Sequence, residues 1–264
     1  MVAKRPNATP NWRWLIPPLV ALILILVFSG TLVHLTTELW WFSAIGFRNV
    51  FWTLLTWRGI TWVGSFIIFA LFLWLNYWFA MRVTRYSTIR LLEGSDLSFY
   101  ADRAPKYIAP IIIFFISLSA AGASVTAWDT LLKFLNASEF NRTDPIYERD
   151  IGFYIFQLPF YEGLQDWLFA LFLTGLLVAG AVYILKGTIN FSRGWQYLIY
   201  GEAKAHICLL LAGLAFLIAF QFWLQRYDLL YSTEGVVSGA GFTDTHARLT
   251  ALTAMGFMAL ALAV

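Results

Sequence analysis

The feature that most constrains this chain is a series of long segments without Lys, Arg, Asp or Glu. They cover 14–37, 59–81, 107–128, 167–185, 205–225 and 249–264. A helix needs roughly 20 apolar residues to cross a bilayer's hydrocarbon core, and each of the first five segments is about that long. We therefore predict an all-α fold: a polytopic transmembrane helical bundle of about six spans with interfacial helices, with residues 1–264 forming one transmembrane domain.

The composition excludes an ordinary soluble domain. Hydrophobic residues make up 60% of the chain and charged residues only 12%, whereas soluble domains average about 25% charged residues. We expect membrane lipid as a partner, other membrane protein subunits as further partners, and no nucleic acid.

Loop charges give the predicted topology a direction. With a cytoplasmic N-terminus, 11 of the Lys and Arg residues lie in inner segments and 7 in outer segments. Because Lys and Arg are enriched in cytoplasmic loops, this orientation is favoured over the reverse. The last segment has 16 residues after Arg248, which reach about 24 Å as a helix. A bilayer core is roughly 30 Å thick, so we expect the sixth span to be truncated.

Two short apolar pieces, 39–47 and 49–57, follow the first predicted span and are rich in Trp and Phe. Neither is long enough to cross a membrane, and aromatic rings favour the headgroup region. We interpret the pieces as interfacial helices; a re-entrant hairpin is the alternative. A separate amphipathic helix is predicted around 131–135, where three Leu residues share one face.

Two predicted outer loops carry unusual patterns of acids, aromatics, Gly and Pro. They are 144–160 and 226–248. Asp244 and His246, with Asp228, are candidates for a metal site or a polar relay, but no Cys or second His supports metal ligation. Hydrogen bonding between the Asp244 loop and the 144–150 segment is the favoured interpretation. The expected structural motif comprises Asp144, Pro145, Asp150, Gly152, Phe153, Tyr154, Pro159, Asp228, Gly241, Asp244 and His246.

These loops also carry a resemblance. The stretches Asp-Ile-Gly-Phe-Tyr at 150–154 and Gly-Ala-Gly-Phe-Thr-Asp at 239–244, with Glu-Leu-Trp-Trp at 38–41, resemble the membrane part of uncharacterised protein family 0182. Members of that family are large bacterial and cyanobacterial membrane proteins with an extracytoplasmic region after the spans. The resemblance implies the bacterial inner membrane, or the thylakoid membrane in a cyanobacterium. It implies no established activity.

The segments between the charged loops offer little for chemistry. Ionisable residues at membrane depth usually mark ion-coupled transport, and the middle of each predicted span has none. Asn76 and Gln221 lie toward span ends, where interhelical hydrogen bonding or solvation at the interface explains them. His34 and His206 fall at opposite predicted membrane faces, where hydrogen-bonded histidines are favoured over pigment ligands. Phosphate-binding and nucleophile-elbow motifs do not occur. We therefore predict no catalytic, metal or cofactor site, and no enzyme.

Small residues at 119–123, 175–180 and 212–213 permit close helix packing, within this chain or against a partner's helix. Two functions remain open from the sequence. The first is a non-enzymatic scaffold or accessory subunit of a membrane assembly. The second is a transporter or channel module for a lipid or other apolar solute, which would need no buried charge.

Overall fold

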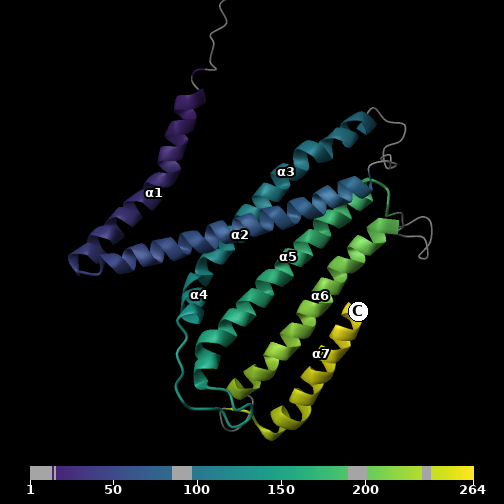
Figure 1. Ribbon diagram of the computed structural model, residues 1–264. Helices are drawn as coiled ribbons and strands as arrows, with labels where there is room; N and C mark the ends of the chain where they lie inside the picture. The colour runs from purple at the N-terminus through teal and green to yellow at the C-terminus, as the bar shows by residue number, and fades with distance from the viewer. Residues whose placement is uncertain (1–13, 15, 85–96, 190–200, 234–238) are drawn as a thin grey trace, which may run out of the picture. The chain divides into compact units, whose positions relative to one another are not determined.

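The computed structural model describes residues 14, 16–84, 97–189, 201–233 and 239–264. Within them, every long element is a helix (Figure 1). The long helices are α1 (Ile16–Ala44), α2 (Arg48–Val83), α3 (Leu97–Ser124), α5 (Leu158–Leu185), α6 (Gly201–Asp228) and α7 (Leu249–Ala263). Together with the turns that extend them, these helices form six segments long and apolar enough to cross a membrane. The predicted all-α fold with six spans is confirmed.

The chain divides into two compact units, the first of which ends at Thr56. Its described part contains α1 and the start of α2, joined by a tight turn. At this turn Gly46 adopts φ +81°, its N–H donates to the Ser43 carbonyl, and the Phe47 N–H donates to the Phe42 carbonyl. This is a Schellman ending, which favours glycine because a Cβ is strained at positive φ.

The turn corrects one prediction. The pieces 39–47 and 49–57 are not separate interfacial helices, because most of the first forms the end of α1 and the second forms the start of α2. Their aromatic side chains meet across the turn, with ring centroids of Phe42 and Phe51 6.1 Å apart. The sequence prediction failed because it ended each helix at the nearest charge. A single Glu38 or Arg58 does not end a helix.

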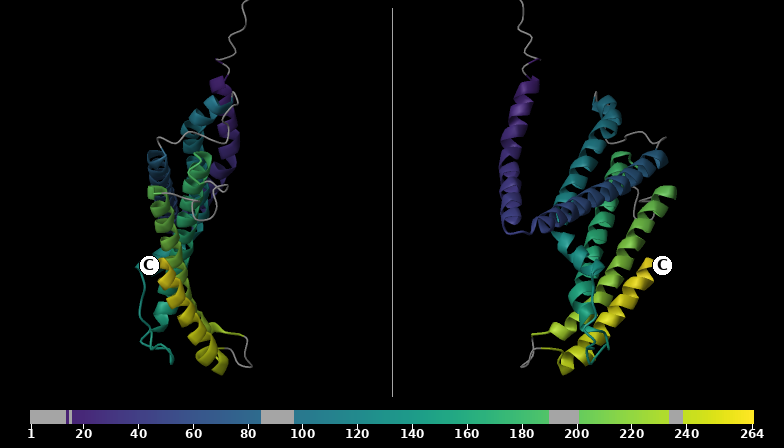
Figure 2. Two further views of the ribbon diagram at one scale, coloured as in Figure 1. Left: turned by 90° about the vertical axis from the view of Figure 1, so that its right-hand side faces the viewer. Right: turned by 60° about the vertical axis from the view of Figure 1, so that its left-hand side comes forward.

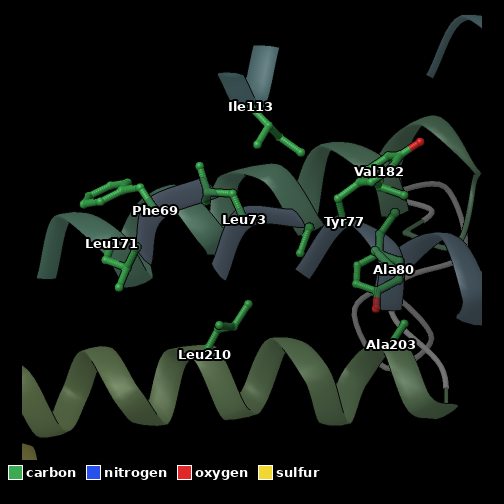
Figure 3. Packing of buried hydrophobic residues seen from close by; sticks show 11 residues of the cluster. Phe69, Leu73, Tyr77, Ala80, Ile113, Leu171, Val182, Ala203 and Leu210 are labelled. Atoms are coloured by element: carbon green, nitrogen blue, oxygen red, sulfur yellow. The ribbon is translucent and has the colours of Figure 1, made fainter. Parts of the chain in front are cut away.

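The second unit, from Trp57, is organised around a core from four helices. Helix α2 contributes Phe69, Leu73, Tyr77 and Ala80, and side chains from α3, α5 and α6 pack against them (Figure 3). Leu73 and Tyr183 are completely buried. Most other apolar side chains on these helices face outward, as expected where lipid replaces water as the surrounding solvent.

Two glycines within the spans permit close approach between helices of this unit. A Cβ on Gly175 of α5 would lie 2.6 Å from the Phe72 ring of α2. A Cβ on Gly213 of α6 would collide with the Phe172 ring of α5. At both positions the small residue serves packing within the chain, which was one of the two readings of the sequence. Gly180 has open space where a Cβ would lie.

Helices α5, α6 and α7 follow one another side by side (Figures 1 and 2). A short helix, α4 (Trp128–Leu135), precedes the loop into α5 and confirms the amphipathic helix predicted around 131–135. The α4–α5 and α6–α7 connections lie at the same end of this unit (Figure 1). We call this the Asp144 end. The opposite end of α5 and α6, which holds Tyr183 and His206, is the His206 end.

Candidate functional site

The Asp144 end is organised by the carboxylate of Asp144. Its Oδ1 accepts hydrogen bonds from the backbone N–H groups of Ile146 at 2.8 Å and Tyr147 at 2.6 Å. Its Oδ2 accepts from the Arg149 N–H at 2.9 Å and from the Tyr154 hydroxyl at 2.8 Å. Pro145 lies in the turn that the carboxylate encloses, where its fixed φ suits the conformation. One buried side chain thus holds the whole turn.

Electrostatics favour the ionised form of Asp144. Burial opposes ionisation, but the bonds from Tyr147, Tyr154, Arg149 and Ile146 together outweigh it and lower the pKa of Asp144 below its ordinary value. The carboxylate therefore acts as a fixed structural anion rather than as a proton carrier at neutral pH.

A second carboxylate, Asp150, fastens the chain on either side of this turn. It accepts from the backbone N–H groups of Phe140 at 3.0 Å, Arg142 at 3.2 Å and Gly152 at 2.7 Å. The Phe140 bond, with those from Gly152 and Arg142, lowers the pKa of Asp150. Gly152 is buried, and a Cβ there would collide with the Ser138 carbonyl oxygen. The backbone can pass only because this residue is glycine.

Aromatic rings connect the Asp144 turn to the end of α6. The Tyr147 hydroxyl donates to the Arg226 carbonyl at 2.6 Å, and the Tyr227 ring lies 4.9 Å from Tyr147 and 5.0 Å from Phe153. Phe153 and Tyr154 belong to a π-helical turn, η4 (Phe153–Gln157), that opens α5, and Pro159 occupies its first helical turn. Single π-helical turns of this kind recur at functional sites.

The second predicted loop also ends in a π-helical turn, η8 (Asp244–Arg248), at the start of α7. Asp244 accepts from the Gly241 N–H at 3.0 Å and from the Arg248 guanidinium at 3.1 Å. His246 stacks on Phe242 with centroids 4.0 Å apart. These contacts are local. The predicted hydrogen bonding between the 226–248 loop and 144–150 occurs at the first residue of that loop, where the Tyr147 hydroxyl donates to the Arg226 carbonyl, and is not seen at Asp244 or His246 among the described residues.

Two acids that are 66 positions apart in the sequence lie near each other at the Asp144 end. The carboxyl groups of Glu162 on α5 and Asp228 on α6 lie close enough to interact electrostatically. Asp228 also lines a pocket of about 620 Å³, with Tyr231, Arg248 and Met255.

Polar side chains within the spans form further contacts between helices. The Trp167 indole N–H of α5 is shared between Ser65 Oγ of α2 at 3.0 Å and Ser124 Oγ of α3 at 3.2 Å. The two serine hydroxyls are 2.9 Å apart. Gln165 of α5 donates to the Leu217 carbonyl of α6 at 3.4 Å. Each contact joins different helices of the same chain.

His206 is the centre of the contact at the other end. Its Nδ1 lies 2.9 Å from the Tyr183 hydroxyl and its Nε2 lies 2.9 Å from Asn76 Oδ1. This confirms the hydrogen-bonded reading of His206 and Asn76. Both ring nitrogens are engaged, so neither is free for a pigment metal. His34 lies on α1 beside Glu38, with 3.8 Å between Nε2 and Oε1.

In the described ranges, no three His, Cys, Asp or Glu side chains gather as metal ligands would. Asp244, His246 and Asp228 therefore do not form a ligand set there.

Comparison with known proteins gives the family. Residues 15–264 match the uncharacterised protein family UPF0182. A UPF0182 protein of Trichodesmium erythraeum is 51% identical over 247 residues, covering 93% of this chain and 27% of that protein. One of Cupriavidus necator is 34% identical, with coverages of 90% and 26%. One of Thermobifida fusca is 31% identical, with coverages of 96% and 25%.

The chain spans about a quarter of the length of these relatives. No solved structure matches it. Both loop stretches that carried the resemblance, 150–154 and 239–244, lie within the matched region. The chain belongs to the uncharacterised protein family UPF0182.

Proposed function

We propose that this chain is a non-enzymatic structural module of a larger membrane assembly, a scaffold or accessory part whose helices hold one another in place. The observation that supports the proposal is that polar side chains within the spans form hydrogen bonds between helices of this chain. Trp167, Ser65 and Ser124 bind one another across three helices, and Tyr183, His206 and Asn76 do the same at the His206 end. Such bonds fix helix positions.

The Asp144 end supports the same function. Asp144 and Asp150 are surrounded by donors from their own loop, which makes a rigid surface rather than an open reaction site. Because the relatives are about four times longer, this surface is suited to supporting further parts of the same protein or other subunits. We place the assembly in the bacterial inner membrane, or the thylakoid membrane of a cyanobacterium, with the N-terminus cytoplasmic.

The second candidate is a transporter or channel module for a lipid or other apolar solute. It is favoured by the pocket of about 620 Å³ beside Asp228 and a smaller apolar groove between α6 and α7. A volume of 300–1,000 Å³ is typical of small-molecule sites. A transporter must also alternate between two helix arrangements, which the polar contacts between helices oppose.

Two measurements on the whole protein separate the candidates. Native mass spectrometry after purification in mild detergent should show a complex of fixed stoichiometry, containing further subunits or copies. Reconstitution into vesicles with fluorescent phospholipids should leave the rate of lipid movement between leaflets at its protein-free value. A monodisperse single chain that accelerates lipid movement would refute the scaffold and favour the transporter.

A further inference from the structure

The groove between α6 and α7 combines an apolar wall with one cation. It has a volume of about 140 Å³ and is lined by Ala219, Trp223, Arg226, Leu252, Thr253, Gly256, Phe257 and Leu260. From Leu252 to Leu260 it follows nine residues of α7, a rise of about 12 Å along the helix. This is too small for a whole drug-sized solute, but its narrow apolar form suits part of an acyl chain.

Arg226 stands where the groove reaches the Asp144 end, two residues before α6 ends. Its guanidinium lies 4.3 Å from the Trp223 ring centroid and contacts the Tyr147 hydroxyl. Its Nε is buried and has no hydrogen-bond partner. Within the described part of the chain, no carboxylate forms an ion pair with this guanidinium. A guanidinium has five N–H donors and its charge is best balanced by an anion that accepts several of them.

We propose that this groove binds one anionic membrane phospholipid, with its phosphate on Arg226 and an acyl chain along Leu252, Phe257 and Leu260. Three observations support this occupant. The lining has a single charged residue, which is positive. That residue lies at a span end, where headgroups lie. The wall leading away from it into the span is apolar, as an acyl chain requires. The site does not depend on the proposed scaffold function, since either candidate could hold a lipid.

Lipid titration monitored by native mass spectrometry tests the proposal on the whole protein in mild detergent. The probes are phosphatidylglycerol and an uncharged galactosyl diacylglycerol with the same acyl chains. We expect tighter binding of phosphatidylglycerol, and roughly ten-fold weaker binding of it to Arg226→Gln, the loss of one charge-assisted contact. Ala219→Leu, which adds bulk to the wall, should weaken both lipids.

Matched controls separate this site from general surface charge. Arg149 also stacks on an aromatic ring, with its guanidinium 5.5 Å from the Phe153 centroid, but it lies outside the groove. Arg149→Gln should bind phosphatidylglycerol as the unmodified protein does. Tyr147→Phe removes the hydroxyl beside Arg226 and should also bind normally, which guards against an indirect effect of the loop. Arg226→Lys should retain most of the affinity.

The proposal is overturned if Arg226→Gln and Arg149→Gln bind phosphatidylglycerol equally, or if the uncharged lipid binds as tightly as the anionic one. Unchanged binding by Ala219→Leu would also overturn it, because the acyl chain would then lie elsewhere. A folded Arg226→Lys variant with no affinity would show that charge is not what binds the lipid.

Discussion

Replacing Asp144 with alanine tests the central role of this residue at the Asp144 end. The substitution removes the acceptor of four hydrogen bonds, three from backbone N–H groups and one from the Tyr154 hydroxyl. Ile146 and Arg149 are exposed, so water can replace the carboxylate at their N–H groups. Tyr154 is buried and only 7% exposed, so its hydroxyl would lose its partner without compensation.

The size of the effect follows from these differences. A buried donor left unsatisfied costs about 1–3 kcal/mol, and a bond to a charged group contributes about 1.5–3 kcal/mol. Counting mainly the bonds from Tyr154 and Tyr147, and discounting the two exposed amides, we expect the loop to lose about 2–4 kcal/mol of local stability. Asp144→Asn keeps one acceptor oxygen and should lose roughly half as much.

Hydrogen–deuterium exchange of peptides covering 140–157, in detergent micelles, measures this directly. A loss of 2–4 kcal/mol raises the population of the open loop by about 30-fold to 900-fold, and exchange should accelerate by the same factor. Peptides from the middle of α6 should not change. If exchange of 140–157 in Asp144→Ala stays within three-fold of the unmodified protein, the carboxylate does not hold the turn and our account of this end is wrong.

Three further predictions concern pH and the helix contacts. The pKa values of Asp144 and Asp150 are lowered on folding, so the stability that their ionised forms contribute is complete above the unfolded value of about 3.9 and is lost as pH falls through the lower folded values. After correction for intrinsic rates, hydrogen exchange of 140–157 should therefore be constant from neutral pH to about 4 and should accelerate below it. The acceleration should be smaller in Asp144→Asn. Trp167→Phe removes the N–H shared by Ser65 and Ser124 and should cost about 0.6–1.7 kcal/mol in detergent unfolding, whereas an unchanged stability would remove this contact from the account. Gly213→Val places a side chain against Phe172 and should cost about 1–3 kcal/mol; Gly180→Val is the control with open space around it, and equal thermal shifts for both would contradict the packing.

The spans could be predicted from the sequence because they are marked by the absence of charged residues. A charged residue deep in a bilayer is costly, so uncharged segments of sufficient length at 59–81, 107–128 and 205–225 mark helices whatever their packing. Helix ends were harder. Charge shows where a helix leaves the hydrocarbon but not where its hydrogen bonds stop, so α5 begins well before residue 167 and includes Glu162 and Asp166.

The polar contacts between helices could not be predicted from the sequence, for one physical reason. Trp167, Ser65 and Ser124 are far apart in the chain, and a single sequence has no pattern that pairs them. The same is true of Tyr183, Asn76 and His206. One sequence signal could have placed the start of α5 correctly: Pro159 suits the first turn of a helix, and Glu162 and Asp166 follow it at a four-residue spacing. The loop motif was found because acids, Gly and Pro are concentrated there.

We propose that polar contacts lock the second unit into one arrangement, as a structural module requires. Double electron–electron resonance between spin labels at Leu71 on α2 and Leu209 on α6, both exposed apolar positions, tests it in the whole protein after replacement of the free Cys208. We predict one narrow distance distribution in detergent and in lipid bilayers, unchanged by added phospholipid. Two distances whose populations shift with lipid would contradict a locked scaffold and favour a transporter.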